Sequence, residues 1–593
     1  MQVLVYLFVA VILYVLAGRI YGNYIGRFFG LNAERPTPAV VVNDGRDFVP
    51  TKTSVVFGHH FATIAGAGPI LGPTLALLYG YLPAWIWIVF GGIFIGAVHD
   101  FSALFASVRE EGRSISEIAR RAMGKTGFTL FIIFTIIMIL LVTSSFLKAT
   151  AVSLTSEWPI EKLGLTADQT LLKTRVNNDG VLLGRIGGIA STSVIIITGM
   201  APLLGYLLYK KNVRVAYVFL LAALLCIISV VIGFQVPITL QPTTWMIILA
   251  VYVTLAAGIP VWIILQPRDF TNVQLLYAGI CLLTAGLVAG GFSGSLHFSA
   301  PASNIAEGTG HIGFIWPMLC ITIACGAVSG FHALAAGGTT SKQVRDERAT
   351  KSIGFNAMLL ESALAVGVVL ALASSLNFSD YKSLVWPTLA GGKANPVLAF
   401  SLAVGHLLNS SLGIPTAIGT IFGILMVEGF VVTTLDSAVR INRYLFEELW
   451  SIILASPPKA MRSYWFNSGL SAVLMLVMAY YNAFVTNWLA FGSANQLLAA
   501  LTLFSIAVWF MSRGKIAWMI IIPGIFMMVT TIASLLLLPR LYLEKHAYTL
   551  LVMDLLLLAL SLGVVIVAAK TFRSKWLEMK KMGAAQEIEF AQK

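Results

Sequence analysis

The sequence contains little charge. Asp, Glu, Lys and Arg together make up 11% of its 593 residues, whereas 58% are hydrophobic and the mean hydropathy is +0.86. A soluble protein of this length would need far more charge to cover its surface. Apolar runs of about 20 residues recur along the chain, each long enough to cross roughly 30 Å of hydrocarbon. Because these runs do not alternate with a period of two, we expect an all-α polytopic membrane protein rather than a β-barrel.

Features of other protein classes are missing as well. No stretch between the apolar runs is long enough for a soluble catalytic domain, so we do not expect an enzyme. The four cysteines lie inside apolar runs without CxxC or metal-ligand spacing, which predicts small core residues and no cofactor. The net charge of +13 would suggest a nucleic-acid partner in a soluble chain. Here Lys and Arg lie in short loops, where they orient a membrane protein, so we expect no nucleic acid.

Apolar runs separated by charged loops predict about fifteen membrane spans. Their centres lie near residues 10, 67, 95, 138, 198, 225, 254, 285, 324, 365, 424, 474, 499, 526 and 558. Basic residues gather in alternate loops, such as residues 109–125, 342–351 and 440–462, and in the tail after residue 570. The positive-inside rule places these loops in the cytoplasm. We therefore expect the N-terminus outside and the C-terminus inside, in the inner (plasma) membrane.

Glycine and proline interrupt two of the predicted spans. The sequence "GAGP" (residues 66–69) falls near the middle of span 2, and "AGIP" (residues 257–260) falls in span 7. Proline removes a backbone donor, and glycine lowers the cost of leaving the helix. Unwound backbone inside a membrane is tolerated where it lines a cavity, and free amides at the start of a half-helix suit an anion. The predicted substrate-binding residues are Gly66, Ala67, Gly68, Pro69, Gly258, Ile259 and Pro260.

The two interruptions lie five spans apart, in helices that run in opposite directions. This pattern is typical of transporters built from inverted repeats, with the substrate held between the repeats. We therefore predict a five-plus-five inverted-repeat (LeuT-like) core with discontinuous helices 2 and 7. The expected organisation is a first helix and loop (1–50), repeats in 51–240 and 241–445, accessory helices in 446–569 and a basic tail in 570–593. Glycine and proline also merely kink many membrane helices, and that alternative stays open.

Several titratable side chains fall inside the predicted spans, where they are costly and mark proton or substrate routes. Histidine takes and releases protons near neutral pH, and a neighbouring carboxylate tunes it. Glu361 and Asp554 are further acids within spans, and we expect Asp554 to be a structural pairing residue. The predicted proton-coupling residues are His59 and His60 in span 2, His99 and Asp100 in span 3, His332 in span 9 and, as runner-up, Glu428 in span 11.

Other roles for these groups stay open. Each histidine can instead bind a carbonyl or hydroxyl group and fix the packing. Three histidines and one aspartate can hold Zn²⁺, although no helix carries them at a spacing of three or four residues. Ser329 can ligate Na⁺ together with carbonyls of span 2, or can be a small residue that allows close helix packing.

Several blocks of the sequence resemble the carbon starvation protein A family of inner-membrane transporters. They are "NDGRDFVPTKTSVVFGHHFATIAGAGPILGP" (43–73), "AVHDFSALFASVREEGRSI" (97–115), "GAVSGFHALAAGGTTSKQV" (326–344), "FVVTTLDSAVRINRYLFEE" (430–448) and "FGSANQLLAAL" (491–501). Gly337 departs from the pattern, because we expect serine there in the family. The resemblance implies kinship with the amino acid/polyamine/organocation superfamily and its five-plus-five core. It also implies uptake of peptides during carbon starvation, or of pyruvate with protons.

These observations favour a proton-coupled symporter that imports pyruvate or a short peptide by alternating access. The alternatives are a Na⁺-coupled transporter, a metal-binding membrane protein, and a sensor or channel. A sensor is disfavoured because the sequence contains no output domain. The choice between pyruvate and peptide stays open, and so does a homo-oligomer.

Overall fold

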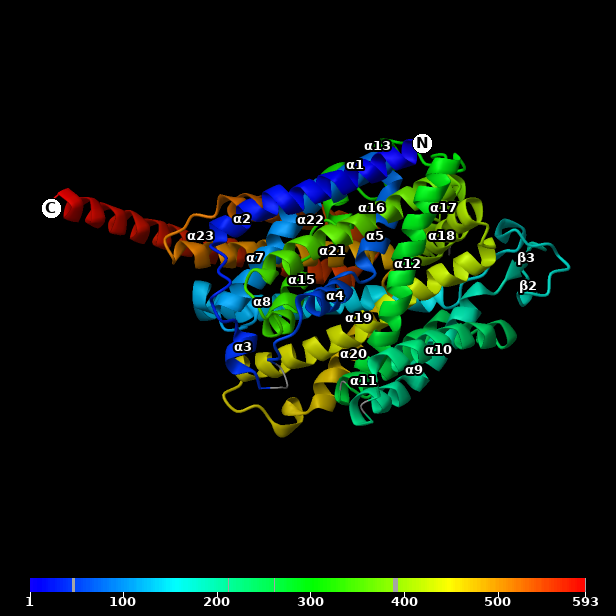
Figure 1. Cartoon of the computed structure of the whole chain (residues 1–593), viewed down its shortest axis with the longest axis horizontal. Coiled ribbons are helices and arrows are strands. Elements are labelled where there is room, and N and C mark those ends of the chain that lie inside the picture. The colour runs from blue at the N-terminus through cyan, green and yellow to red at the C-terminus, as the bar shows by residue number, and fades with distance from the viewer. Residues whose placement is uncertain (45–47, 212, 261, 388–392, 592–593) are drawn as a thin grey trace.

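The computed structural model describes residues 1–44, 48–211, 213–260, 262–387 and 393–591, which are almost entirely helical (Figure 1). The first half contains α1 (Gln2–Leu16), α2 (Gly22–Phe29), α3 (Pro38–Val42), α4 (Thr53–Ile64), α5 (Gly68–Ala76), α6 (Tyr81–Gly91), α7 (Ala97–Arg109), α8 (Ile115–Ser153), α9 (Ile186–Gly205), α10 (Val215–Gln235), α11 (Pro242–Gly258) and α12 (Leu265–Ser293). The second half contains α13 (Ile305–His311), α14 (Ile315–Thr322), α15 (Phe331–Gly338), α16 (Ala357–Ser375), α17 (Phe378–Val385), α18 (Pro396–Leu412), α19 (Thr416–Ile453), α20 (Tyr464–Tyr481), α21 (Phe484–Met511), α22 (Trp518–Glu544) and α23 (Tyr548–Ala591).

Eleven of the described helical segments are long and apolar enough to cross a membrane, or twelve if the bent pair α4/α5 is one span. The prediction of a helical, polytopic membrane protein is confirmed. α8 and α21 pack on each other along the centre of the bundle, whereas α10 lies at the rim. One face of α10 exposes Leu220, Leu224 and Ile227 by more than half, as expected for a helix that contacts lipid.

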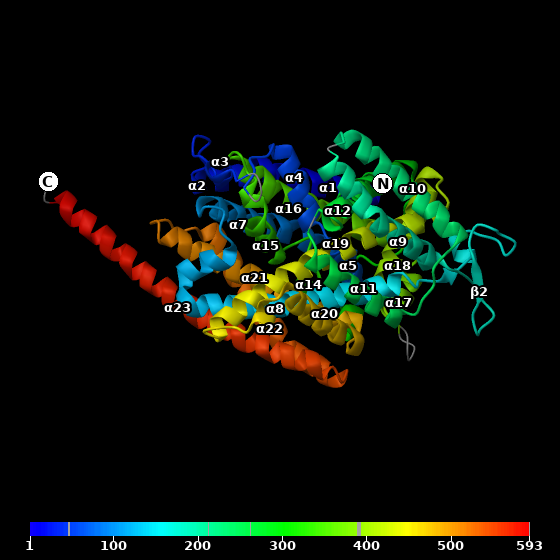
Figure 2. The same cartoon turned by 90° about the horizontal axis from the view of Figure 1, so that it is seen from below.

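The termini of the described chain lie at opposite ends of the bundle, and the end of α23 projects beyond it (Figures 1 and 2). A small antiparallel sheet lies at the end where α1 begins. Its strands are β1 (Trp158–Pro159), β2 (Thr174–Val176) and β3 (Leu182–Gly184), in the order β1-β3-β2. Lys162 beside the sheet pairs with Asp380 on α17, which ties the sheet to the helices.

The predicted interruption at residues 66–69 is confirmed as a break between α4 and α5. The two helices enclose a bend of 44°. Ala65 leaves the helical conformation (φ −74°, ψ 53°), and the Gly66 N–H donates to Ile64 O at 2.8 Å instead of to a carbonyl four residues back. Pro69 occupies the second position of α5, where its missing N–H costs no helical hydrogen bond.

A second interruption separates α14 from α15, at residues 323–330, in the predicted span 9. Gly326 there has φ +86°, which other residues rarely adopt. The stretch packs directly on α5: a Cβ on Gly68 would lie 2.4 Å from Cys325 Cβ, and one on Gly72 would lie 2.8 Å from Thr322 O. Glycine at these positions therefore allows the two broken helices to touch.

The predicted discontinuity of helix 7 is wrong. α11 ends at Gly258, and the next helix, α12, begins at Leu265, so residues 257–260 form the end of one helix. Arg440 donates to Ala256 O at 2.7 Å and to Ile259 O at 2.8 Å, and Arg443 donates to Ala257 O at 2.8 Å. These arginines bind carbonyls that the helix end leaves without helical partners. Pro260 follows the helix end, a common position for proline.

Candidate functional site

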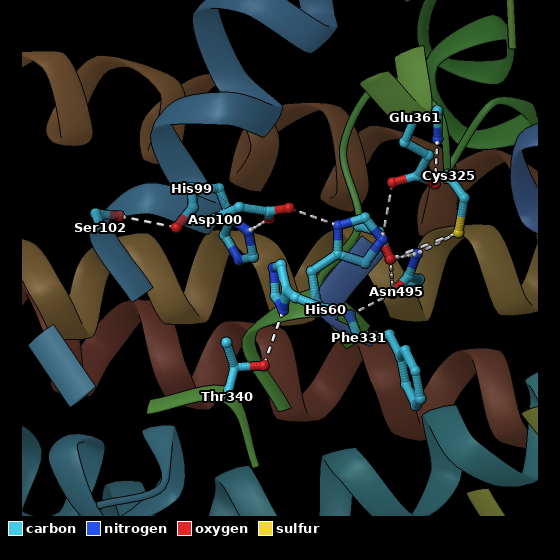
Figure 3. A network of polar contacts seen from close by, with 12 residues as sticks. His60, His99, Asp100, Ser102, Cys325, Phe331, Thr340, Glu361 and Asn495 are labelled. Carbon is cyan, nitrogen blue, oxygen red and sulfur yellow. Dashed lines mark hydrogen bonds and ion pairs between the residues drawn. The ribbon is translucent and has the colours of Figure 1, made fainter. Parts of the chain in front are cut away.

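Asp100 on α7 lies at the centre of a buried cluster of titratable side chains (Figure 3). Its Oδ1 is 2.8 Å from Nδ1 of the neighbouring His99, and its Oδ2 is 2.7 Å from Nδ1 of His332 on α15. All three side chains are at most 1% exposed. One carboxylate thus binds two imidazoles, and this pairing offsets the cost of burying its charge. The structure brings together these three of the residues that the sequence nominates for proton coupling.

The cluster continues to a second carboxylate, on α16. His332 Nε2 is 3.3 Å from Oε2 of the fully buried Glu361. Glu361 Oε1 accepts a hydrogen bond of 3.2 Å from the Gly326 N–H, which belongs to the interruption between α14 and α15. We call His99, Asp100, His332 and Glu361 the acid–histidine relay. An imidazole that binds one carboxylate at Nδ1 and lies close to a second at Nε2, without a hydrogen bond there, can take a proton at one side and release it at the other.

Side chains of α21 hold the interruption between α14 and α15. Asn495 donates from Nδ2 to Ser329 Oγ at 3.1 Å, and its Oδ1 accepts from the Phe331 N–H at 3.0 Å. Trp488 donates to Thr322 O at 2.9 Å, and Gln496 donates to Cys320 O. These bonds satisfy backbone groups that no helix pairs.

His60 lies near the relay and binds a different partner. Its Nδ1 is 2.9 Å from Oγ1 of Thr340, in the short turn after α15, while its Nε2 is buried without a hydrogen bond among the described residues (Figure 3). His59 is exposed. Its backbone carbonyl accepts from the Thr63 hydroxyl at 2.8 Å. The two adjacent histidines therefore have different surroundings.

The predicted substrate-binding residues on α4/α5 differ in accessibility. Ala67, Gly68 and Pro69 are buried against the second interruption, whereas Gly66 is half-buried. A Cβ on Gly66 would lie 3.1 Å from Oγ1 of Thr434 on α19, which is also half-buried. The less buried side of the break therefore packs closely on α19. Gly258, Ile259 and Pro260 belong to the end of α11.

Glu428 lies on α19, beside Thr150 and Ser153 of α8, and is fully buried. Its described contacts do not include the acid–histidine relay. Ser329 contacts Asn495 and Cys325. Within the described residues, no group of three or more His, Cys, Asp or Glu side chains is arranged to hold a metal ion. In the acid–histidine relay, the imidazole Nδ1 atoms contact the Asp100 carboxylate and do not converge on a common point where a metal ion could bind.

Glu361, Asn495 and Arg268 are not among the site residues expected from the sequence. Glu361 stood out only as an acid within a span. Asn495 and Gln496 are the polar pair in "FGSANQLLAAL", and their position inside an apolar run could have indicated helix-to-helix hydrogen bonds. Arg268 is 2% exposed and pairs with Asp436 at 2.8 Å. From sequence alone, a basic residue near the start of a span is interpreted as part of the preceding loop, because its packing is not known.

The family model for carbon starvation protein CstA matches residues 2–395 and 377–534. The chain belongs to the carbon starvation protein CstA family. The peptide transporter CstA of Bacillus subtilis (strain 168) is 30% identical over 95% of this chain and 96% of that protein. The pyruvate/proton symporter BtsT of Escherichia coli (strain K12) is 29% identical over 88% of this chain and 80% of that protein. Membership of this family makes the chain a membrane transporter and not an enzyme.

Solved transporter structures resemble the chain more distantly. A manganese transporter of Eremococcus coleocola, in complex with an aromatic bis-isothiourea substituted compound, has a TM-score of 0.47 and 8% identity over 90% of this chain and 98% of that chain. MhsT in complex with L-phenylalanine has a TM-score of 0.45 and 12% identity over 88% of this chain and 100% of that chain. At TM-scores below 0.5, these likenesses decide neither the helix assignment nor the substrate.

Proposed function

We propose that this CstA-family protein is a proton-coupled importer of a small carboxylate-bearing nutrient, either pyruvate or a short peptide. The acid–histidine relay is the observation that carries the proposal, because it joins three helices through titratable groups and ends on the backbone of an interrupted helix. Relatives in the family are named for both substrates. The inner membrane is the proposed location, with the N-terminus outside and the C-terminus in the cytoplasm.

The relay supplies a chemical reason for coupling. With Asp100 and Glu361 ionised and His332 protonated, these three groups carry a net charge of −1 in a buried site, which favours uptake of one more proton. A proton on Glu361 weakens its acceptance of the Gly326 N–H. Protonation then loosens the stretch that packs on α5, so that it biases the movement of the two broken helices.

Helix packing supports a core of two five-helix repeats, with boundaries that differ from the predicted ones. We assign α4/α5, α6–α7, α8, α11 and α12 to the first repeat, and α14/α15, α16, α19, α20 and α21 to the second. Equivalent pairs of helices then make equivalent contacts. The third helices, α8 and α19, each pack on the last two helices of the other repeat: α8 on α20 and α21, and α19 on α11 and α12. The second helices also pack on the broken helix of the other repeat, α7 on α15 and α16 on α5. The hairpin α9–α10 and the pair α17–α18 are insertions in this arrangement.

This assignment also supports the predicted fifteen crossings. α11, α20 and the pair α14/α15 cross the membrane in addition to the twelve spans counted by length and apolarity. An odd number of crossings agrees with termini at opposite ends of the bundle. In alternating access, the broken helices with α6–α7 and α16 move against α8, α11, α19 and α20.

The substrate carboxylate is proposed to bind at the α4/α5 break. The half-buried Gly66 and Thr434 lie on its less buried side, and the start of α5 offers the positive end of a helix dipole. The predicted roles of Gly258, Ile259 and Pro260 are not part of this proposal, because they form a capped helix end. A Na⁺ ion at Ser329 stays the alternative coupling ion, and a homo-oligomer stays a prediction.

Uptake by proteoliposomes tests the function. Labelled pyruvate and labelled dialanine are offered in parallel, with an inward proton gradient, an inward Na⁺ gradient or neither. The proposal expects concentrative uptake of one substrate under the proton gradient alone. Concentrative uptake that needs Na⁺ and ignores the proton gradient would contradict it.

A further inference from the structure

Four buried oxygen atoms between α8 and α19 have no hydrogen-bond partner among the described residues. They are both carboxylate oxygens of Glu428, Thr150 Oγ1 and Ser153 Oγ, and all three side chains are fully buried. The two hydroxyl groups face the Glu428 carboxylate and interact with it as hydrogen-bond donors do, although neither pair reaches full hydrogen-bond geometry. Buried polar atoms are nearly always paired, so four unpaired oxygens at one point call for an explanation.

Other hydroxyl groups of the same helix behave differently. Thr135, Thr143 and Ser145 of α8 each donate to a carbonyl four residues back, at 2.7 to 2.9 Å. Serine and threonine hydroxyl groups inside membrane helices usually make this hydrogen bond to the helix backbone. Thr150 and Ser153 have no such bond, although they lie three residues apart on one face of α8. Their oxygens are therefore available to a ligand beside Glu428.

The charges around Glu428 favour a cation. Three other buried acids have a positive or protonatable neighbour: Asp100 and Glu361 lie against His332, and Asp436 binds Arg268. Arg268 lines the small cavity next to Glu428, but Asp436 already pairs with it, and Asp269 follows it in the chain. The guanidinium of Arg268 thus interacts with Asp436 and Asp269, and Glu428 has no cationic partner of its own among the described residues.

The helix ends at the same place and adds to the negative potential. α8 ends at Ser153, so the negative end of its dipole, roughly half an elementary charge, lies at the two hydroxyl groups. A carboxylate at a helix C-terminus is unfavourable without a compensating cation. Oxygen ligands at about 2.4 Å from a hard cation lie roughly 3.4 Å from one another, beyond hydrogen-bond distance. Neighbouring oxygens that face one another without reaching full hydrogen-bond geometry fit such a coordination shell.

We propose that Glu428, Thr150 and Ser153 form a binding site for a monovalent metal cation, Na⁺, which ties α8 to α19. The adjacent cavity, lined by Asn272 and Thr198 among others, offers room for a water ligand. Both helices belong to the body against which the broken helices move, so the ion stabilises this body and is not the coupling ion. The site is independent of the acid–histidine relay.

Purified full-length protein in nanodiscs tests the site. NaCl replaces choline chloride at constant ionic strength and neutral pH, while the thermal unfolding midpoint and ²²Na⁺ binding are measured. We expect saturable stabilisation and saturable binding in the wild-type protein. Glu428→Gln keeps the shape of the side chain but removes the charge, and should raise the half-saturating Na⁺ concentration at least about tenfold. Thr150→Val and Ser153→Ala should each raise it less.

Asp554→Asn is the matched control, because Asp554 is a second buried acid whose oxygens lack hydrogen bonds in the described residues, but on α23. It should bind Na⁺ as the wild-type protein does, and so should the relay variant Asp100→Asn. Proton-driven uptake by the same variants tests the proposed function separately. If Glu428→Gln does not fold, Ser153→Ala decides. Equal effects of Na⁺ and choline, unchanged binding by Glu428→Gln, or full stabilisation by acid without Na⁺ would overturn the proposal.

Discussion

Replacing Asp100 by asparagine should uncouple transport from the proton gradient. Asp100 holds His99 at 2.8 Å and His332 at 2.7 Å, one imidazole on each oxygen. Asparagine keeps the shape but offers one acceptor, so one of these charge-assisted bonds is lost. The relay also loses its net negative charge, because His332 and Glu361 then form a pair of total charge zero. The driving force for taking a second proton disappears.

The size of the effect follows from the burial of the group. Removing one partner of a buried ion pair typically costs about 3–5 kcal/mol. Because 1.4 kcal/mol is about tenfold, the lower value already shifts the protonation equilibrium by more than roughly 100-fold. An imposed gradient of about one pH unit supports about tenfold accumulation by a symporter that moves one proton per substrate. The variant should show no accumulation above equilibration.

Two measurements on the same proteoliposomes separate uncoupling from misfolding. Gradient-driven uptake should be lost, while exchange of internal for external labelled substrate should continue, because exchange needs no net proton movement. Asp554→Asn controls for the loss of a buried acid outside the relay. Wild-type accumulation by Asp100→Asn would refute the assigned role. Loss of both uptake and exchange in a folded variant would refute the uncoupling.

Three further predictions concern other parts of the molecule. Gly68→Ala places a Cβ 2.4 Å from Cys325 Cβ, so it should abolish uptake, and a second change, Cys325→Gly, should restore part of it. Arg440→Ala removes two hydrogen bonds at the end of α11 and should lower the thermal midpoint, by about 1.5–3 kcal/mol in unfolding free energy, with a smaller effect for Arg440→Lys. Outside the spanning helices, the side-chain hydrogen bond from Asn304 lowers the pKa of Glu307. This bond stabilises the fold at pH values above the pKa of Glu307 in the unfolded chain, and the stabilisation is lost as pH falls through the lowered pKa in the folded protein. The difference in thermal midpoint between wild type and Asn304→Ala should therefore disappear once the pH is below that lowered pKa.

Local chemistry in the sequence was enough to predict the first interruption and three of the four relay residues (His99, Asp100 and His332), but not which side chains contact one another. Pro69 with its neighbouring glycines predicts an interruption of the helix from local sequence alone. Pro260 carries the same signal and proved to follow a helix end, because local sequence does not tell a break within a span from the end of a span. The interruption at Gly326 has no proline, and its reason is tertiary: close approach to α5. Glu361 was visible as an acid, but its position beside His332 depends on the packing of α16.

The proposed repeats give the relay a further property. In the proposed assignment α7 and α16 are the second helices of their repeats, so Asp100 and Glu361 would occupy equivalent helices related by the inversion. His332 lies between them on a broken helix, nearer to Asp100 at 2.7 Å than to Glu361 at 3.3 Å. A structure built from inverted repeats interchanges the environments of equivalent helices when it opens to the other side. The His332 imidazole is then expected to lie closer to Asp100 in one conformation of the transport cycle and closer to Glu361 in the other. Coupling needs no long proton path in this arrangement, because one histidine with two acids, attached to the moving backbone through Gly326, links proton occupancy to the direction of opening.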